Sequence, residues 1–140
     1  MPELRGLHSP DLWDMEHDAP ADPTDFCILV QVFVGPSGEA GEESFDFLVC
    51  TPRWLIRHVE ENGPLFARHH LVINRYDYEA IYHAIDSLCQ DLVAATWGEV
   101  GERLGRYGRW EFEDYHELQP APPDGQFATS GGPQRLQSGA

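Results

Sequence analysis

The chain has 140 residues and a formal net charge of −15, and all nine of its basic residues are arginine. Hydrophobic residues make up 41% of it and aromatic residues 11%, enough for one domain with its own apolar core. The charge argues against nucleic acid and anionic membranes as partners, because both need a basic surface. It favours a cationic protein partner, although a charge that only keeps the protein soluble explains the composition equally well.

The cysteines and the start of the chain bear on the compartment. The chain has three cysteines, Cys27, Cys50 and Cys89, and no C-x-x-C motif. An odd number without that spacing indicates neither a disulfide framework nor a zinc ribbon. No secretory signal follows Met1, and the longest apolar stretch, residues 26–34, is too short to cross a bilayer as a helix. We therefore expect a cytoplasmic protein with reduced thiols and no membrane contact.

The first third of the chain predicts strands. Residues 3–8 are typical of a short edge strand, and residues 11–25 of an acidic surface loop without any basic residue. Residues 26–34 are nearly all apolar, β-branched or aromatic, which predicts a strand buried on both faces. After a Gly-rich break at 35–42, the alternating residues 43–50 complete a long antiparallel hairpin.

Three helices are predicted after the hairpin. The first begins at Thr51-Pro52, a cap followed by proline in the first turn, and ends at Gly63. Asp77 caps the longest helix, and Thr96 with Glu99 forms a capping box that opens a shorter one. The buried stripe expected of the first helix is Trp54, Leu55, His58 and Val59.

Two more strands, at residues 71–73 and 109–115, complete the predicted elements, with Trp110 and Phe112 of the last strand facing the core. Strands followed by helices predict an α+β fold: an antiparallel or mixed sheet of four to five strands with about three helices packed on one face. Residues 119–140 are rich in Pro, Gly, Ser and Gln. We therefore predict one domain over 1–118 and a disordered tail over 119–140.

Two motifs suggest chemistry. His69-His70 suggests a metal ligand pair, but neighbours on a strand point to opposite faces and no H-E-x-x-H occurs, so we predict no metal site. Cys50 precedes a helix N-terminus, which can lower a thiol pKa. No histidine is placed by the sequence to activate it, and burial at a strand end is the favoured interpretation. We expect no catalytic residue and no cofactor.

Charged residues near the last strand suggest binding. Residues 105–110 mix arginine with aromatics, as nucleic-acid surfaces do, but in so acidic a chain a helix-to-strand turn is the favoured interpretation. Glu111 and Glu113 lie two residues apart on one predicted strand and so share a face. With Asp46 on the neighbouring hairpin, they predict an acidic sheet face opposite the helices that could dock a cationic active site.

Two long segments carry a resemblance to a known family: EESFDFLVCTPRWL at 42–55 and LGRYGRWEFEDY at 104–115. Shorter matches are LHSPD at 7–11, VGP at 34–36, YDY at 76–78 and LC at 88–89. Over residues 3–117 the chain resembles the immunity protein 8 family. The resemblance implies a cognate inhibitor from a bacterial polymorphic toxin system, which protects the producing cell and has no catalytic residues to transfer.

An inhibitor of this kind is expected to occlude the active site or substrate surface of its toxin, and to be a monomer or weak homodimer when free. A few aromatic or charged anchors carry most of the energy in such interfaces. The candidate toxin-binding residues are Asp46, Tyr107, Arg109, Glu111, Glu113, Asp114 and Tyr115. Two alternatives stay open: a small enzyme with a site at Cys50, His58 or His70, and a structural adaptor in a secretion-related complex.

Overall fold

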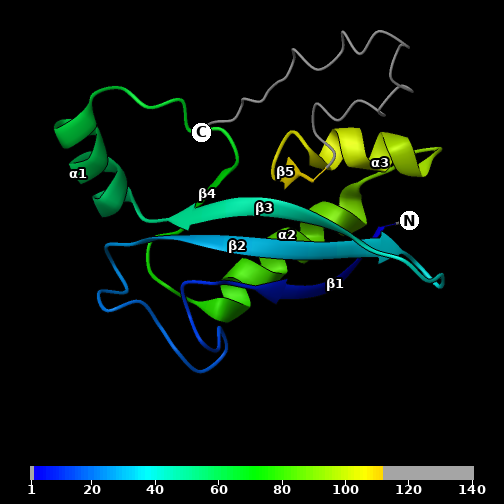
Figure 1. Ribbon diagram of the computed structural model, residues 1–140, viewed down its shortest axis with the longest axis horizontal. Coiled ribbons are helices and arrows are strands. Elements are labelled where there is room, and N and C mark those ends of the chain that lie inside the picture. Colours follow the sequence, from blue (N-terminus) through cyan, green and yellow to red (C-terminus); the bar gives the residue numbers. More distant parts are fainter. Residues whose placement is uncertain (1, 112–140) are drawn as a thin grey trace, which may run out of the picture.

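The computed structural model describes residues 2–111 and contains a mixed five-stranded sheet with three helices, which confirms the predicted α+β class (Figure 1). The elements in chain order are β1 (Pro2–His8), β2 (Cys27–Pro36), β3 (Glu43–Cys50), α1 (Pro52–Asn62), β4 (His70–Val72), α2 (Tyr78–Asp91), α3 (Trp97–Leu104) and β5 (Arg109–Trp110). The predicted domain over 1–118 and tail over 119–140 extend beyond the described residues and stay predictions.

The centre of the sheet is the predicted hairpin. β2 and β3 pair antiparallel from Cys27 opposite Cys50 to Val34 opposite Glu43, and β1 is the edge strand beside β2. The other side of β3 is shared between two short strands. Residues 48–50 pair parallel with β4, and residues 45–46 pair antiparallel with β5.

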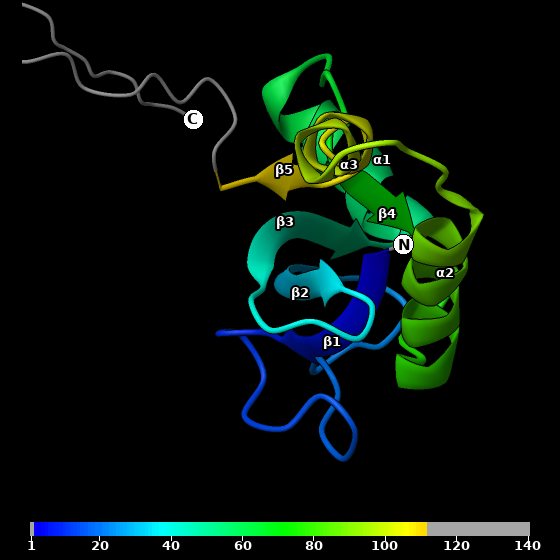
Figure 2. The ribbon, with the colours of Figure 1, turned by 90° about the vertical axis from the view of Figure 1, so that its right-hand side faces the viewer.

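Helices α2 and α3 cover one face of the sheet, here called the inner face (Figure 2). Alternation along the strands directs every second apolar side chain to this face. On α2, Ile81, Ile85 and Cys89 are buried at helical spacing, and α3 adds Val100 and Leu104. The strand residues of the same core are Leu4, Ile28, Val30, Val32, Val34, Phe45, Phe47 and Val49.

The prediction that residues 26–34 are buried on both faces is wrong. Along β2, buried positions alternate with half-exposed ones, which are Cys27, Leu29, Gln31 and Phe33. An apolar run of this length indicates a strand but does not report what covers each of its faces. The consequence is an outer face of the sheet, opposite α2, that carries open apolar side chains.

All three predicted helix caps are confirmed. The Thr51, Asp77 and Thr96 side chains accept hydrogen bonds from the backbone N–H groups of Trp54, Ala80 and Glu99. The predicted stripe of α1 is not fully buried, however: Trp54, Leu55 and His58 are half-buried and Val59 is exposed. In Figure 1, α1 lies beyond the end of β3 and not over the sheet, so two of the three helices pack on the inner face.

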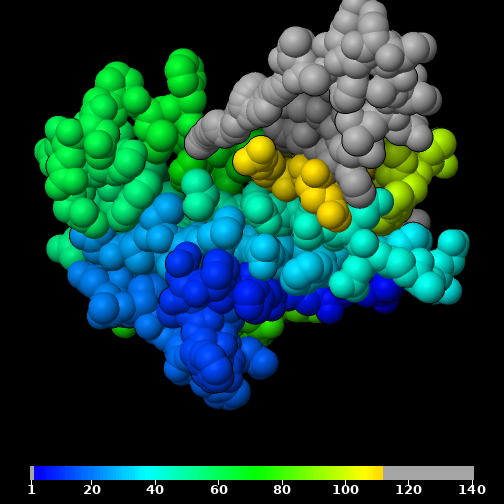
Figure 3. All heavy atoms as spheres, viewed as in Figure 1, coloured from blue at the N-terminus to red at the C-terminus, as the bar shows by residue number. Residues whose placement is uncertain are grey.

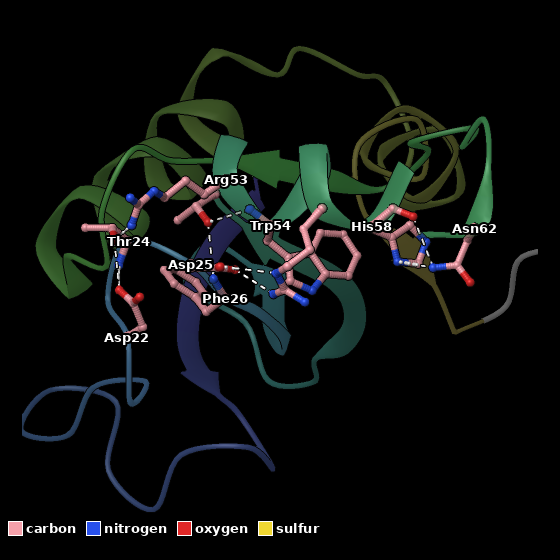
Figure 4. A network of polar contacts seen from close by, with 10 residues as sticks. Asp22, Thr24, Asp25, Phe26, Arg53, Trp54, His58 and Asn62 are labelled. Carbon is pink, nitrogen blue, oxygen red and sulfur yellow. Dashed lines mark hydrogen bonds and ion pairs between the residues drawn. The ribbon is translucent and has the colours of Figure 1, made fainter. Parts of the chain in front are cut away.

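Polar contacts hold α1 against the end of the acidic loop (Figure 4). Arg57 makes two contacts with Asp25, Nη2 to Oδ1 at 2.7 Å and Nε to Oδ2 at 3.2 Å. Arg53 Nη1 donates to Thr24 Oγ1 at 3.1 Å. Since the ion pair is partly exposed, it orients the helix more than it stabilises the protein.

The surroundings of Trp110 give a structural role to much of the motif at 104–115. Trp110 stacks on Phe45 with ring centroids 6.3 Å apart, and its indole N–H, like that of Trp97, donates to the Glu43 carboxylate. A Cβ at Gly108 would lie 2.3 Å from Phe47 Cε1, so only glycine fits there. These motif positions maintain the fold and need not contact a partner.

Candidate protein-binding surfaces

The predicted acidic face is partly assembled by the structure. Asp46 lies directly opposite Arg109 on the outer face of the sheet. Glu111 is joined to the same region, since its N–H donates to the Ser44 carbonyl at 3.1 Å and its Oε1 accepts from the Ser44 N–H at 2.7 Å. Three further candidates, Glu113, Asp114 and Tyr115, lie outside the described residues, as does Phe112.

The outer face is mixed in chemistry and not purely acidic. Its half-exposed positions include the apolar side chains Leu29, Phe33 and Leu48 beside Gln31, which is opposite Asp46. This face is turned toward the viewer in Figure 3, where β2 and β3 run between β1 in dark blue and β5 in orange. An apolar centre with charged groups beside it is the usual anatomy of a protein–protein interface.

The charged carboxylate of Asp46 lowers the stability of the folded protein. Burial raises the pKa of its carboxyl, Arg109 opposes the rise, and Glu111 adds to it. A raised pKa means that the folded state disfavours the charged carboxylate, and this loss of stability is present at neutral pH. Charged groups kept despite such a loss are candidates for binding.

Replacement of Asp46 by asparagine is expected to raise the free energy of unfolding at pH 7 slightly, because it removes the disfavoured charge, and solvent screening at this partly exposed position keeps the gain small. The gain should shrink as the pH falls through the raised pKa of Asp46, since the wild-type carboxyl then becomes neutral as well. Urea unfolding at several pH values measures both effects. The exposed Glu42→Gln serves as the control, and a gain that is equal for both variants contradicts the prediction.

Tyr107 lies apart from the Asp46 group. It is 53% exposed and lines a groove of about 360 Å³ with Ile85 and Leu88 of α2 and Leu71 of β4. A neighbouring hollow of about 230 Å³ shares Leu88, Arg106 and Tyr107 with this groove. The predicted binding residues therefore divide between the outer sheet face and a groove on the side of α2.

The residues named for an enzymatic alternative have different surroundings. Cys50 is fully buried, His58 stacks on Trp54 in α1, and His70 lines the Tyr107 groove. His69 has a backbone φ of 65°, and its Nε2 lies 3.1 Å from the Gly105 carbonyl. Within residues 2–111, no group of three His, Cys, Asp or Glu side chains could hold a metal ion.

Cys50 has another cysteine as its neighbour. Cys27 is its direct partner in the hairpin register, and the Ile73 N–H donates to the Cys50 carbonyl from the far side. The pair thus occupies a non-hydrogen-bonded position of the ladder, where Cα atoms are about 4.5 Å apart, within the range that disulfides bridge. A hydrogen bond between the two thiols raises the pKa of Cys27 and lowers that of Cys50.

Mild oxidation of the purified protein with diamide is expected to join Cys27 to Cys50, because their positions need little adjustment to form the bond. Mass spectrometry should show the loss of two hydrogens, and peptide mapping should leave the buried Cys89 as a free thiol. The Cys27→Ser variant is the control and should show no intramolecular bond. A disulfide bond that involves Cys89 in the wild type would contradict the pairing of Cys27 with Cys50 in the hairpin.

One exposed aromatic is missing from the predicted set. Trp13, in the acidic loop, has 97% of its side chain exposed, whereas Met15 two residues on is buried. The signal was present in the sequence, since a tryptophan stands there among carboxylates with no base within residues 11–25. The pattern predicts a surface loop correctly but does not report which of its apolar side chains points outward.

Taken together, these features define an α+β protein with three candidate binding surfaces: an open sheet face, a groove beside α2 and an exposed tryptophan. The chain belongs to the immunity protein 8 family, whose model matches residues 2–115 and confirms the resemblance seen in the sequence. No curated protein and no solved structure matches it. Membership of an immunity protein family implies a toxin as partner and suggests a protein that is not an enzyme. No helix within residues 2–111 has the length and apolar character needed to cross a membrane.

Proposed function

We propose that this protein binds one cognate toxin, one-to-one, and neutralises it by covering its active site or substrate surface. The observation that carries the proposal is the family match over residues 2–115. The toxin belongs to a bacterial polymorphic toxin system, and neutralisation takes place in the cytoplasm of the producing cell. Before it meets the toxin, the inhibitor is a monomer or a weak homodimer.

The charge of the chain supports a cationic toxin. With a net charge of −15, long-range attraction would speed the encounter with a basic partner and select against acidic ones. Protection of a cell requires a dissociation constant of about 1 nM or lower, about −12 kcal/mol of binding free energy. A cationic nuclease fits this description, because such an enzyme needs a basic surface for its own substrate.

Co-expression with the neighbouring reading frame tests the function. The product of that frame should stop growth when expressed alone, and this chain should restore growth and co-purify with it in a one-to-one complex. Light scattering gives the stoichiometry and separates an inhibitor from a structural adaptor, which would enter a larger assembly. A product that is harmless alone, or that never co-purifies, contradicts the proposal.

A further inference from the structure

We propose that Trp13 and its flanking carboxylates dock a basic protein surface, with the indole seated in a recess of the partner among lysine or arginine side chains. We call residues 9–18 the Trp13 loop. The inference rests on the proposed function, because the basic partner it names is the toxin. It goes further by assigning the docking to a loop that lies outside the predicted set of binding residues.

The shape around Trp13 suits an anchor. The side chain is 97% exposed, and tryptophan is among the residues that most often dominate binding energy. Two hollows adjoin it. One, of about 370 Å³, is lined by His8 to Leu12, and the other, of about 270 Å³, by residues that include Met15, Glu16 and Tyr78. The indole therefore lies beside recesses that side chains of a partner can fill.

The backbone on one side of Trp13 is fixed to the sheet. Ser9 is buried, and its hydroxyl accepts a hydrogen bond from the Asp11 N–H at 3.1 Å. Asp11 in turn caps an open position of β2, since its Oδ2 accepts from the Leu29 N–H at 2.8 Å. This places the start of the Trp13 loop before any partner arrives.

The backbone on the other side is fixed to the core. Met15 is only 6% exposed, and its carbonyl accepts a hydrogen bond of 2.6 Å from the Tyr76 hydroxyl. Asp14 and Asp18 close the following turn, where the Asp14 N–H donates to Asp18 Oδ2 at 2.9 Å. A loop that is ordered in advance loses less conformational entropy on binding, which favours affinity.

Charge selects the partner. The Trp13 loop holds four carboxylates and neither lysine nor arginine: Asp11, Asp14, Glu16 and Asp18. The hydrogen bond from His17 lowers the pKa of Asp14, so this carboxyl next to the indole stays charged at neutral pH. A lysine or arginine over the indole face would gain a cation–π contact while its charge meets these carboxylates. A second copy of this chain would instead be repelled.

The test measures binding of the neighbouring reading frame's product by calorimetry with the full chain and matched variants. Trp13→Ala is expected to weaken binding about 30-fold or more, as for a central anchor. Phe66→Ala is the matched control, because this side chain is 99% exposed in a different loop, and it should change the dissociation constant less than about 2-fold. Both variants should unfold at the wild-type temperature.

A charge reversal provides the second arm. Glu16→Lys should weaken binding more than Glu42→Lys, although both positions are exposed and both change the net charge equally. If the wild type and Trp13→Ala bind the product with equal affinity, the proposed docking surface is wrong, but the proposed function stands. If only Asp46→Ala loses binding, the interface lies on the outer sheet face, and the proposed docking by the Trp13 loop is wrong. No binding by the wild type overturns both proposals.

Discussion

Replacement of Phe45 by alanine is expected to lower the free energy of unfolding by about 3–5 kcal/mol, as truncations of buried aromatic side chains do. Phe45 is 1% exposed and is the largest fully buried side chain of the described chain. It also stacks on Trp110, so its loss leaves a cavity next to β5. Urea unfolding followed by circular dichroism measures the change.

Phe66→Ala is the natural control for this experiment, because it removes the same atoms from a side chain that is 99% exposed. Its free energy of unfolding should stay within about 0.5 kcal/mol of the wild type. A loss below about 1 kcal/mol for Phe45→Ala would mean that Phe45 is not in a packed core, and would contradict the inner face described above.

Thr51→Ala is expected to lower the free energy of unfolding by about 2–4 kcal/mol, because one buried hydroxyl serves two backbone groups. Thr51 Oγ1 accepts from the Phe26 N–H at 3.1 Å and from the Trp54 N–H at 3.4 Å. Its removal leaves α1 without a cap and leaves a donor at the start of β2 without its acceptor. Thermal unfolding monitored by calorimetry measures the loss.

Thr51→Ser preserves the hydroxyl and should recover most of that stability, although it leaves a small gap in place of the methyl group. Recovery of less than half would show that Thr51 acts through packing and not through its hydrogen bonds. Because this residue lies in one of the two long family motifs, the comparison also tests whether that motif maintains the fold.

Local signals explain which elements could be predicted from the sequence. Helix starts depend on single residues, so Thr51, Asp77 and Thr96 could be identified as caps without knowledge of the fold. The hairpin follows from two neighbouring runs of alternating or apolar residues. Each of these signals depends only on residues that lie within a few positions of one another in the chain.

Long-range contacts explain what could not be predicted. The pairing of β4 and β5 with different halves of β3 depends on segments far apart in the chain, and both strands are very short. Helix α1 illustrates the same point. Its amphipathic pattern predicts an apolar stripe, but the pattern does not predict whether another element covers that stripe.

The candidate binding residues differ in the same way in how far the sequence predicts their place. Asp46 and Glu111 could be placed on one sheet face because strand alternation fixes direction, and Arg109 joins them through the register with β3. Tyr107 is close to them in the chain, but it lies in a turn and lines the groove beside α2. Which of Trp13 and Met15 is exposed and which is buried is seen only in the folded loop.

Helix α1 has a further consequence for motion in the native protein. Regions with few buried apolar contacts open at lower free energy than the core, in separate cooperative units. Since no residue of α1 is fully buried and the polar contacts described for it are its cap and those of two arginines, we expect it to form such a unit. Its amide hydrogens should exchange with deuterium well before those of α2, through openings that leave the sheet intact.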